Sequence, residues 1–332
     1  MKSIHIPYKG RVMTNVNTVC GLIDSKDLGF MLMHEHLANS SAGIPQVFPE
    51  FMDTDLARDA GIRALADAYS EGIRSYMDVT TMDLGRDMQL IKSIAENSKV
   101  HVILATGLWL DIPRAIVNGV TADQLADSFV KEIEIGIEGT HIKAGIIKVA
   151  TSEEGVTPGN ELVLRAASRA AIQTGVPIST HTAAREKVGN DQIEIFENEG
   201  VDLRKVYIGH SNDTDDIEYL TGLADKGCTV GLDRYPGGFR GSIRTGLDWE
   251  ERTVVAAKLI ELGYQKKISL SHDFPITFMR LPDQELARQE QNPEGICFIS
   301  RIVLPRLRQL GVQDSAIESM MVDVPRNLFD GV

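Results

Sequence analysis

The stretch GFMLMHEH, residues 29–36, places a short apolar run directly before two histidines. A nearly continuous apolar run is typical of a strand that is covered on both faces, as in a parallel sheet. Residues two apart on a strand face the same side, so His34 and His36 should point together while Glu35 points away. The motif therefore predicts a buried parallel strand with two imidazoles on one face of its carboxyl end.

Similar apolar runs recur along the chain with helical patterns between them. The predicted strands are Gly29–His36, Arg74–Thr80, Val100–Gly107, Ala144–Ala150, Val176–His181, Val206–His210, Cys228–Asp233 and Lys267–Asp273. Helical spacing is clearest over Asp55–Gly72, Asn160–Gly175 and Thr253–Gly263. This alternation predicts an α/β protein, a single-domain (β/α)8 TIM barrel over residues 1–332, with residues 1–28 as an N-terminal extension that caps the barrel.

A doubly wound open sheet is the competing architecture. No GxGxxG motif follows the first predicted strand and no P-loop occurs, which disfavours a nucleotide-binding sheet of that kind. The longest irregular segment, Gly237–Asp248 (GGFRGSIRTGLD), is expected to be a flexible loop after the seventh strand.

Composition narrows the class of partner and the compartment. The net charge is -13, whereas nucleic acids and anionic membranes require a basic surface, so a small-molecule substrate is expected instead. No apolar run reaches the length of a membrane span, and the N-terminus lacks the apolar core of a signal peptide, although a leader removed earlier stays open. The three cysteines (Cys20, Cys228 and Cys297) are far apart, which favours a reducing, cytoplasmic location over a disulfide framework or a thiolate zinc site.

Polar residues gather at the carboxyl ends of the predicted strands, which meet at one face of a barrel. They are His34, His36, Lys148, His181, His210 and Asp273. Imidazole and carboxylate groups brought together in this way predict a metal site, for which zinc, cobalt, manganese and iron are all suitable. The remaining histidines, His5, His101, His141 and His272, are expected to be structural or exposed, and His272 should face away from the barrel interior.

Lys148 lies within an apolar strand, in the sequence GIIKVA. A buried ammonium group is costly, so a lone lysine there would pair with a carboxylate or reach toward solvent. Next to metal ions the neutral amine is favoured instead, and a neutral lysine can react with carbon dioxide to give a carbamate with two metal-binding oxygens. Asp273 also has two interpretations, since it can act as a metal ligand that accepts a proton or as the N-cap of a following helix.

The chain resembles the phosphotriesterase family of the amidohydrolase superfamily, which includes phosphotriesterase-like lactonases. The resemblance covers nearly the whole length and rests on LGFMLMHEHLANSSAG, ATGLWLDIP, AGIIKVATSEEGVTP, HTAAREKVG, IGHSNDTDD, GLDRYP and SHDF. It implies a dimeric hydrolase with two divalent metal ions, zinc being the first expectation.

Each ligand is assigned by this resemblance. His34, His36 and Asp273 would bind the more buried ion, while His181 and His210 would bind the more exposed one. Carboxylated Lys148 and a hydroxide would bridge the two ions. Asp273 would take the proton, and Asp233, at the end of the seventh predicted strand, is the candidate for a relay or a substrate contact, with His210 also in a catalytic position.

The segments that are expected to contact the substrate resemble two different subgroups of the family. ATGLW, with Trp109, is similar to the organophosphate-degrading enzymes, whereas GLDRY, with Arg234 and Tyr235, is similar to the lactonases. The resemblance implies hydrolysis of lactones or aryl esters and of organophosphate triesters, with these three residues contacting the substrate.

Other functions remain open. One is a dedicated organophosphate triesterase, or aryldialkylphosphatase, acting at the same site. A mononuclear amidohydrolase or deaminase acting on C–N bonds is a second alternative, disfavoured by Lys148. A non-catalytic binding protein on a barrel scaffold is a third, disfavoured by the complete ligand set.

Overall fold

The computed structural model describes residues 15–240, 243–244, 246–279 and 289–332. His5 and residues 1–14 of the predicted cap lie outside the described residues, as do residues 241, 242 and 245 of the predicted flexible loop. No helix in the described ranges is both long and apolar enough to cross a bilayer.

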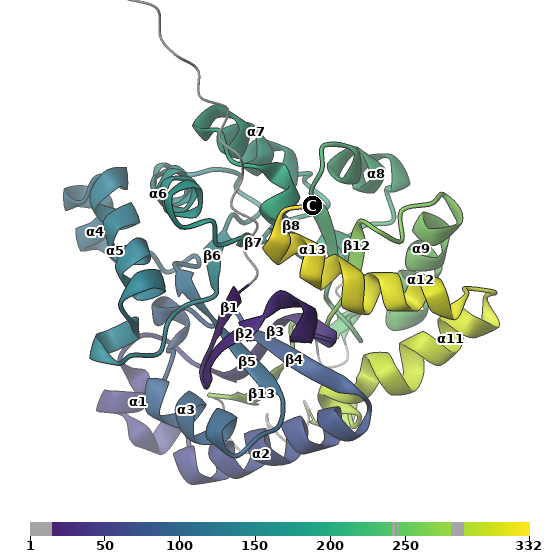
Figure 1. Cartoon of the computed structure of the whole chain (residues 1–332), viewed down its shortest axis with the longest axis horizontal. Coiled ribbons are helices and arrows are strands. Elements are labelled where there is room, and N and C mark those ends of the chain that lie inside the picture. Colours follow the sequence, from purple (N-terminus) through teal and green to yellow (C-terminus); the bar gives the residue numbers. More distant parts are fainter. Residues whose placement is uncertain (1–14, 241–242, 245, 280–288) are drawn as a thin grey trace, which may run out of the picture.

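Parallel strands form one sheet that curls into a barrel (Figure 1). Their order is β12 (Ile268–Leu270), β9 (Thr229–Leu232), β8 (Val206–Ile208), β7 (Ile178–His181), β6 (Ile146–Ala150), β5 (His101–Gly107), β4 (Ile73–Asp78), β3 (Phe30–Asn39) and β13 (Pro275–Phe278). Strands β12 and β13 are successive parts of one segment, of which the first pairs with β9 and the second with β3. The ring is thereby closed, which confirms the (β/α)8 barrel and excludes an open doubly wound sheet.

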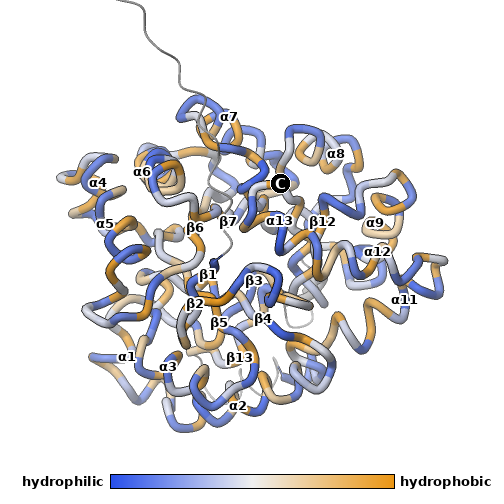
Figure 2. Tube along the Cα trace, viewed as in Figure 1, coloured by the Kyte–Doolittle hydropathy of each residue, from blue (hydrophilic) through white to orange (hydrophobic). Residues whose placement is uncertain are grey.

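Helices alternate with these strands and surround them. The main ones are α2 (Thr54–Ser70), α3 (Met88–Glu96), α5 (Ala122–Glu134), α6 (Pro158–Thr174), α7 (Gly189–Glu199), α8 (Ile217–Asp225) and α9 (Trp249–Glu261), with shorter α1 (Ile44–Val47) and α4 (Arg114–Gly119). The chain ends with α11 (Leu304–Gln309), α12 (Asp314–Glu318) and α13 (Val324–Asp330). Apolar and polar residues alternate along the helices, as expected of amphipathic helices that cover a core (Figure 2).

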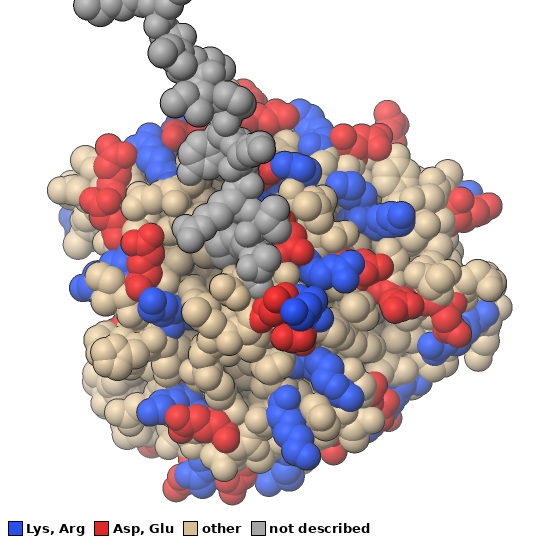
Figure 3. Space-filling view, in the orientation of Figure 1, with Lys and Arg blue, Asp and Glu red and all other residues tan. Residues whose placement is uncertain are grey.

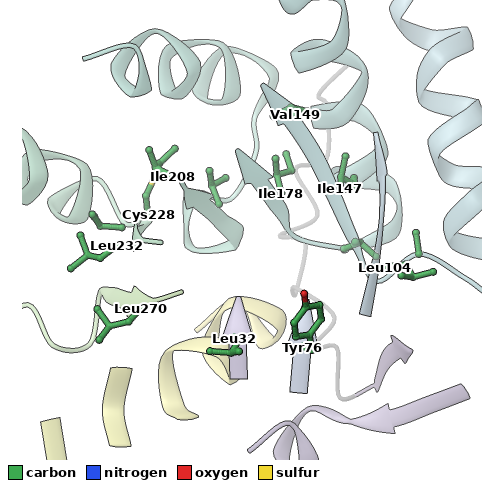
Figure 4. Close-up of a cluster of buried hydrophobic side chains, with 14 of the residues drawn as sticks. Leu32, Tyr76, Leu104, Ile147, Val149, Ile178, Ile208, Cys228, Leu232 and Leu270 are labelled. Carbon is green, nitrogen blue, oxygen red and sulfur yellow. The ribbon is translucent and has the colours of Figure 1, made fainter. Parts of the chain in front are cut away.

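Most of the core lies between the strands and the surrounding helices. Leu32, Tyr76, Leu104, Ile147 and Leu270 belong to this layer and are almost fully buried (Figure 4). Because these five side chains come from five different strands, their packing holds the strands in register and fixes the positions of their carboxyl ends.

A second cluster fills the barrel interior at the end opposite those carboxyl ends. Met31 and Ile103 pack there with Val16 of the β1–β2 hairpin (Asn15–Thr18 and Gly21–Asp24) and with Phe329 of α13. Figure 1 shows the hairpin and α13 lying across this end of the barrel. Among the described residues this cluster fills one end of the barrel and leaves the end with the strand carboxyl ends open to hold a site.

Four predicted strands end earlier than the sequence indicates, and in two of them a candidate ligand lies beyond the strand. Strand β8 stops at Ile208 and β12 at Leu270, so His210 lies in a turn and Asp273 in the segment between β12 and β13. Both residues have left-handed backbone conformations, with φ of 59° and 50°. Such a conformation ends a ladder while keeping the side chain at the strand end, which a pattern of apolar residues cannot reveal.

The segment before α9 also differs from the prediction. Helix α9 begins at Trp249, four residues before the predicted start at Thr253, because Asp248 and Glu251 form a reciprocal capping box. The predicted loop Gly237–Asp248 contains a short antiparallel pair, β10 (Phe239–Arg240) and β11 (Ile243–Arg244).

Candidate metal centre

The six residues predicted as metal ligands come together at the carboxyl ends of the strands. His34 and His36 extend from β3, Lys148 from β6 and His181 from β7, while His210 and Asp273 follow β8 and β12.

Two of these groups, the imidazoles of His34 and His36, lie beside the carboxylate of Asp273. Its Oδ1 lies 3.3 Å from His36 Nε2 and 3.6 Å from His34 Nε2. The ligand atoms of these three residues all fall within 4.8 Å of one another, which is the spacing of groups that can hold one metal ion.

A second set of donors lies beside the first. His210 Nε2 is 2.8 Å from His181 Nδ1 and 3.7 Å from Asp273 Oδ2. Lys148 Nζ is 2.7 Å from His34 Nε2, and the side chain is buried. Lys148 therefore contacts the first set of donors, and Asp273 links both sets.

Asp233 lies behind this cluster. Its Oδ1 accepts hydrogen bonds from the His210 backbone N–H at 2.7 Å and is 2.9 Å from His210 Nδ1, while its Oδ2 is 3.0 Å from His34 Nδ1. A carboxylate on Nδ1 fixes the tautomer and directs Nε2 toward a metal. The carboxylate is buried, and ligand atoms of Asp233, His34 and His210 lie within 4.8 Å of one another, so these three residues could also hold a metal ion. The geometry supports orientation of the two histidines by Asp233, and its role as a relay or substrate contact stays a prediction.

His36 is oriented by residues that the sequence patterns did not single out. Its Nδ1 is 2.7 Å from Thr80 Oγ1, and the buried carboxylate of Asp78 accepts the backbone N–H groups of Thr80 and Leu37. Burial raises the pKa of Asp78, an effect that His36 and these hydrogen bonds partly oppose. An Asp or Thr after an apolar strand is too common in sequences to have indicated this role.

Burial favours the neutral form of three histidines of the centre, His34, His181 and His210, because it lowers their pKa. Lys148 lowers the pKa of His34 and His181 further, and Arg234 that of His181 and His210, while Asp273 partly opposes these effects. Neutral imidazole is the form that binds metals.

The pKa values of Lys148 and Asp273 are both lowered, which favours the neutral amine and the ionised carboxylate that bind metals. Burial lowers the pKa of Lys148 to about 8, with Asp273 and Asp233 partly opposing the effect. Burial alone would raise the pKa of Asp273, but His210, His36, His34 and Arg234 together lower it well below its usual range. An amine that is easily neutralised and an ionised carboxylate therefore both lie beside His34 Nε2.

A cleft of about 290 Å³ opens above these groups. Trp109, Leu84 and Phe278 give it apolar walls, and Asn39 and Asp111 add polar groups. Trp109 Nε1 donates to His181 Nδ1 at 3.3 Å, which places the indole beside the candidate ligands.

The position of Trp109 depends on Asp83, another residue that sequence reasoning missed. Its Oδ2 accepts the Trp109 backbone N–H at 2.9 Å, and its Oδ1 accepts the Thr81 hydroxyl at 2.6 Å. Asp83 is buried, and burial raises its pKa despite these hydrogen bonds.

Arg234 and Tyr235, both predicted to contact substrate, lie in different environments. Arg234 lines the cleft, with Nε donating to Asp273 Oδ2 at 3.2 Å and Nη1 to Asp213 Oδ2 at 2.5 Å. Asp213 is held in turn by Arg252. Tyr235 is buried in the core and does not line the cleft, so the expectation that it contacts substrate is wrong; its ring packs in the layer beneath.

The other described histidines lie apart from the centre. His101 begins β5, His141 is exposed, and His272 is buried against Glu35, so His272 does face away from the cleft.

The donor set fits two divalent metal ions. It consists of imidazole nitrogens and a carboxylate, oriented from behind by Asp233 and Thr80, with an amine that can be neutralised between them. The fold and these groups together define a barrel protein with a candidate metal centre at the carboxyl ends of its strands.

Comparison with known proteins agrees with this class. The model of the phosphotriesterase family matches residues 14–329, and the chain belongs to that family. The chain is 38% identical to a phosphotriesterase homology protein of Mycobacterium tuberculosis over 96% of this chain and 98% of that protein. It is 35% identical to an aryldialkylphosphatase of Saccharolobus solfataricus, over 92% and 96% of the two chains.

A more distant relative acts on a different kind of bond. An N-acetyltaurine hydrolase of Dictyostelium discoideum is 29% identical over 82% of this chain and 73% of that protein. The family is metal-dependent, and these relatives are hydrolases with more than one type of substrate.

Proposed function

We propose that this protein hydrolyses lactones or aryl esters of small size, and organophosphate triesters, at a binuclear metal centre. The observation that carries the proposal is the convergence of His34, His36, His181, His210, Asp273 and a buried Lys148 below one cleft. The aryldialkylphosphatase among the relatives supports the triester part.

His34, His36 and Asp273 would hold one ion, His181 and His210 the other, and carboxylated Lys148 would lie between them. Two divalent ions, zinc being the first expectation, would supply a hydroxide nucleophile and polarise the carbonyl or phosphoryl oxygen of the substrate. Asp233 and Thr80 keep the imidazoles aimed at that position.

Asp273 would accept the proton. Its carboxylate is kept ionised by the neighbouring imidazoles and by Arg234, and it retains 20% exposure toward the cleft. Arg234 links Asp273 to Asp213, but a guanidinium does not give up its proton in proteins. The proton on Asp273 therefore leaves directly to the solvent in the cleft and not through Asp213.

The walls of the cleft suit an uncharged ester with an apolar leaving group. Trp109 and Phe278 offer flat apolar surface to an aryl or acyl group. Arg234 lines the cleft and is anchored by two carboxylates, so its bulk would take up room at that side. A planar lactone needs less room there than a tetrahedral triester, which is why lactones and aryl esters are placed first.

A second candidate is hydrolysis of an N-acyl amide bond. It is favoured by the relatives named N-acetyltaurine hydrolase, which match most of this chain. In the sequence, Lys148 disfavours cleavage of C–N bonds, but membership of one family with such hydrolases removes that argument. The guanidinium of Arg234 could attract an anionic group on an N-acyl substrate.

The test combines metal content with a side-by-side assay. Purified protein should contain close to two divalent ions per chain and should hydrolyse a lactone or phenyl acetate faster than paraoxon or N-acetyltaurine. One ion per chain, or none, would contradict the binuclear centre. A preference for paraoxon would indicate a dedicated triesterase, and a preference for N-acetyltaurine would indicate the amide hydrolase.

The assembly is proposed to be a homodimer. The resemblance to a commonly dimeric family supports this, and so does an exposed apolar patch formed by Val47, Phe48, Phe51 and Leu56, of which Val47 and Leu56 are about two-thirds exposed. Clustered apolar side chains of this kind often mark an interface.

A further inference from the structure

The barrel is closed at the metal centre by side chains. β12 pairs with β9 and β13 with β3, but no ladder joins β12 to β3 among the described strands. The backbone hydrogen bond across this seam runs from Asp273 N–H to His34 C=O, at 3.0 Å. This is the seam that brings His34 and His36 against Asp273.

At the next position along the seam, the acceptor is the side-chain hydroxyl of Ser271 and not a backbone carbonyl. The His34 N–H donates to Ser271 Oγ at 3.0 Å, and Ser271 Oγ–H donates in turn to Glu35 Oε1 at 2.7 Å. Both Ser271 and Glu35 are fully buried. A hydroxyl that accepts from one strand and donates to a carboxylate on the same strand has only one orientation available, so the bridge is rigid.

Glu35 also holds the residue next to Asp273. Its Oε1 accepts the His272 backbone N–H at 2.9 Å and contacts His272 Nδ1 at 2.6 Å. His272 Nε2 accepts the Ile299 N–H at 3.2 Å, which leaves the ring proton on Nδ1 and the ring neutral. Glu35 lies between the candidate ligands His34 and His36, and its Oε1 thus accepts three hydrogen bonds. The donors belong to Ser271 and His272, which are the two residues before the candidate ligand Asp273.

We propose that Glu35 is a positioning residue for the metal centre, fixing the backbone of Ser271 and His272 against His34 and thereby the spacing of the His34, His36 and Asp273 donors. This inference rests on the proposed metal-dependent function. The side chain faces away from the cleft, and its effect passes through the backbone of the ligands on either side of the seam.

Glutamine separates this role from the charge of Glu35. The amide oxygen of Gln can occupy the position of Oε1 and accept the same three hydrogen bonds, whereas Ala removes all three. Ser271→Ala removes the bridge to His34 alone. Ser168→Ala is the matched control, because Ser168 is a fully buried serine with one hydrogen bond, to Leu164 C=O in α6, away from the seam.

The experiment measures Co²⁺ binding to metal-free protein by its visible absorption, together with urea unfolding of the same metal-free samples. Glu35→Ala should weaken Co²⁺ binding by about 10- to 100-fold and alter the Co²⁺ spectrum, as loss of a group that orients ligands does. Ser271→Ala should also weaken Co²⁺ binding and alter the Co²⁺ spectrum. Glu35→Gln and Ser168→Ala should bind Co²⁺ as the wild-type protein does. Leu65→Ala, a core change in α2, should lower stability without changing binding.

Wild-type affinity in Glu35→Ala would overturn the proposal, and so would a loss in Glu35→Gln as large as that in Glu35→Ala. If Glu35→Ala does not fold, Ser271→Ala decides: affinity equal to that of Ser168→Ala would overturn the proposal, and a specific loss would support it. Failure of the wild-type protein to bind Co²⁺ would instead contradict the proposed function.

Discussion

Lys148 is a buried amine whose charge opposes folding of the metal-free protein. Burial lowers its pKa to about 8 from an ordinary value near 10.5. Between these values the unfolded chain binds a proton that the folded chain does not, so stability should rise with pH from about 8 to 10.5, and the full penalty acts below 8. The penalty is on the order of 3 kcal/mol, at about 1.4 kcal/mol for each pKa unit.

Replacing this amine gives a direct test. Metal-free Lys148→Met, prepared with a chelator and without carbon dioxide, should be more stable than wild type at pH 7, and the difference should shrink as the pH approaches 10.5. Urea unfolding across this range measures it. Parallel stability curves for the two proteins would show that Lys148 is not a buried cation.

Asp273 is expected to combine metal binding with proton transfer. Asp273→Asn keeps one oxygen ligand but cannot accept a proton, so metal content should largely persist while kcat falls by about 10²- to 10⁴-fold. Metal analysis and steady-state kinetics at neutral pH separate the two effects. Asp213→Asn, which reaches Asp273 only through Arg234, should have a smaller effect on kcat. Wild-type turnover in Asp273→Asn would exclude it as the proton acceptor.

Arg234 is expected to influence substrate preference. Because Arg234 lines the cleft and His is a smaller side chain, Arg234→His should raise kcat/KM for paraoxon relative to that for a lactone, by about tenfold if the gain resembles that of other pocket contacts. The ratio of the two kcat/KM values, in wild type and variant, is the measurement. An unchanged ratio, or one shifted toward the lactone, would assign Arg234 to structure alone, as its ion pairs with Asp213 and Asp273 would permit.

The sequence predicted the donors of the centre better than their supports. HxH, a lysine in an apolar strand and a histidine ending another strand are unusual enough to be noticed one at a time. Asp233, Asp78 and Asp83 act through buried contacts between strands or loops, and those contacts depend on three-dimensional positions that no local pattern encodes. For Tyr235 the error is of the opposite kind, because a contact with substrate was predicted for a residue that is buried. Its neighbour Arg234 lines the cleft, whereas Tyr235 does not.

At the scale of the elements, a bulge in β3 sets the direction of the ligands. Met31 and Met33 pack inside the barrel, and strict alternation would place Glu35 there next. The pairing of β3 with β4 shifts register between Leu32 and Glu35, so His34 and His36 face the site and Glu35 faces the seam. A bulge re-aims the side chains that follow it, and a two-residue pattern could predict the shared face of the histidines but not this change of phase.

Close approach of β5 to β6 provides a test of how strands place Lys148. Gly107 ends β5 with φ of 109°, and a Cβ there would lie 1.9 Å from the Lys148 carbonyl oxygen. Gly107→Ala must therefore displace the backbone of Lys148, and a shift near 1 Å can cost about 10²-fold in rate. Gly72→Ala is the matched control, because its φ is 93° and open space surrounds the added carbon. Equal activity losses in the two variants would show that backbone strain, and not displacement of Lys148, is responsible.

The net charge of the whole molecule, -13, fits an uncharged substrate better than a polyanion. On the face shown in Figure 3, which is the end crossed by the hairpin and α13 and not the cleft, acidic and basic side chains are intermingled. Closure of the barrel by one C-terminal segment, with the hairpin and α13 across the other end, concentrates all six candidate ligands at a single opening. The convergence of the ligands could be predicted from the sequence because the carboxyl ends of parallel strands point the same way. The lengths of the strands could not be predicted.

The proposed homodimer is the property of the whole molecule that remains to be tested. Phe48 and Phe51 are nearly half exposed, and their rings lie 5.9 Å apart between α1 and α2. In a twofold-symmetric dimer the same patch meets its own copy, so each charge introduced is placed in the interface twice. Phe48→Glu/Phe51→Glu should therefore be monomeric in sedimentation equilibrium at micromolar concentration while wild type is dimeric. Both side chains are exposed in the monomer, so the free energy of unfolding of each isolated chain should change little.

A second apolar surface supplies the control for this dimer test. Val254 and Leu310 line a groove between α9 and the segment that follows α11, and both are at least 39% exposed. Val254→Glu/Leu310→Glu should remain dimeric if the patch on α1 and α2 is the interface. A dimer that survives Phe48→Glu/Phe51→Glu but dissociates in the control variant would place the interface on the groove, and a wild-type monomer would remove the dimer altogether. Because only residues 40–43 separate α1 from Asn39, which ends β3 and lines the cleft, loss of the correct interface should also raise KM more than it lowers kcat.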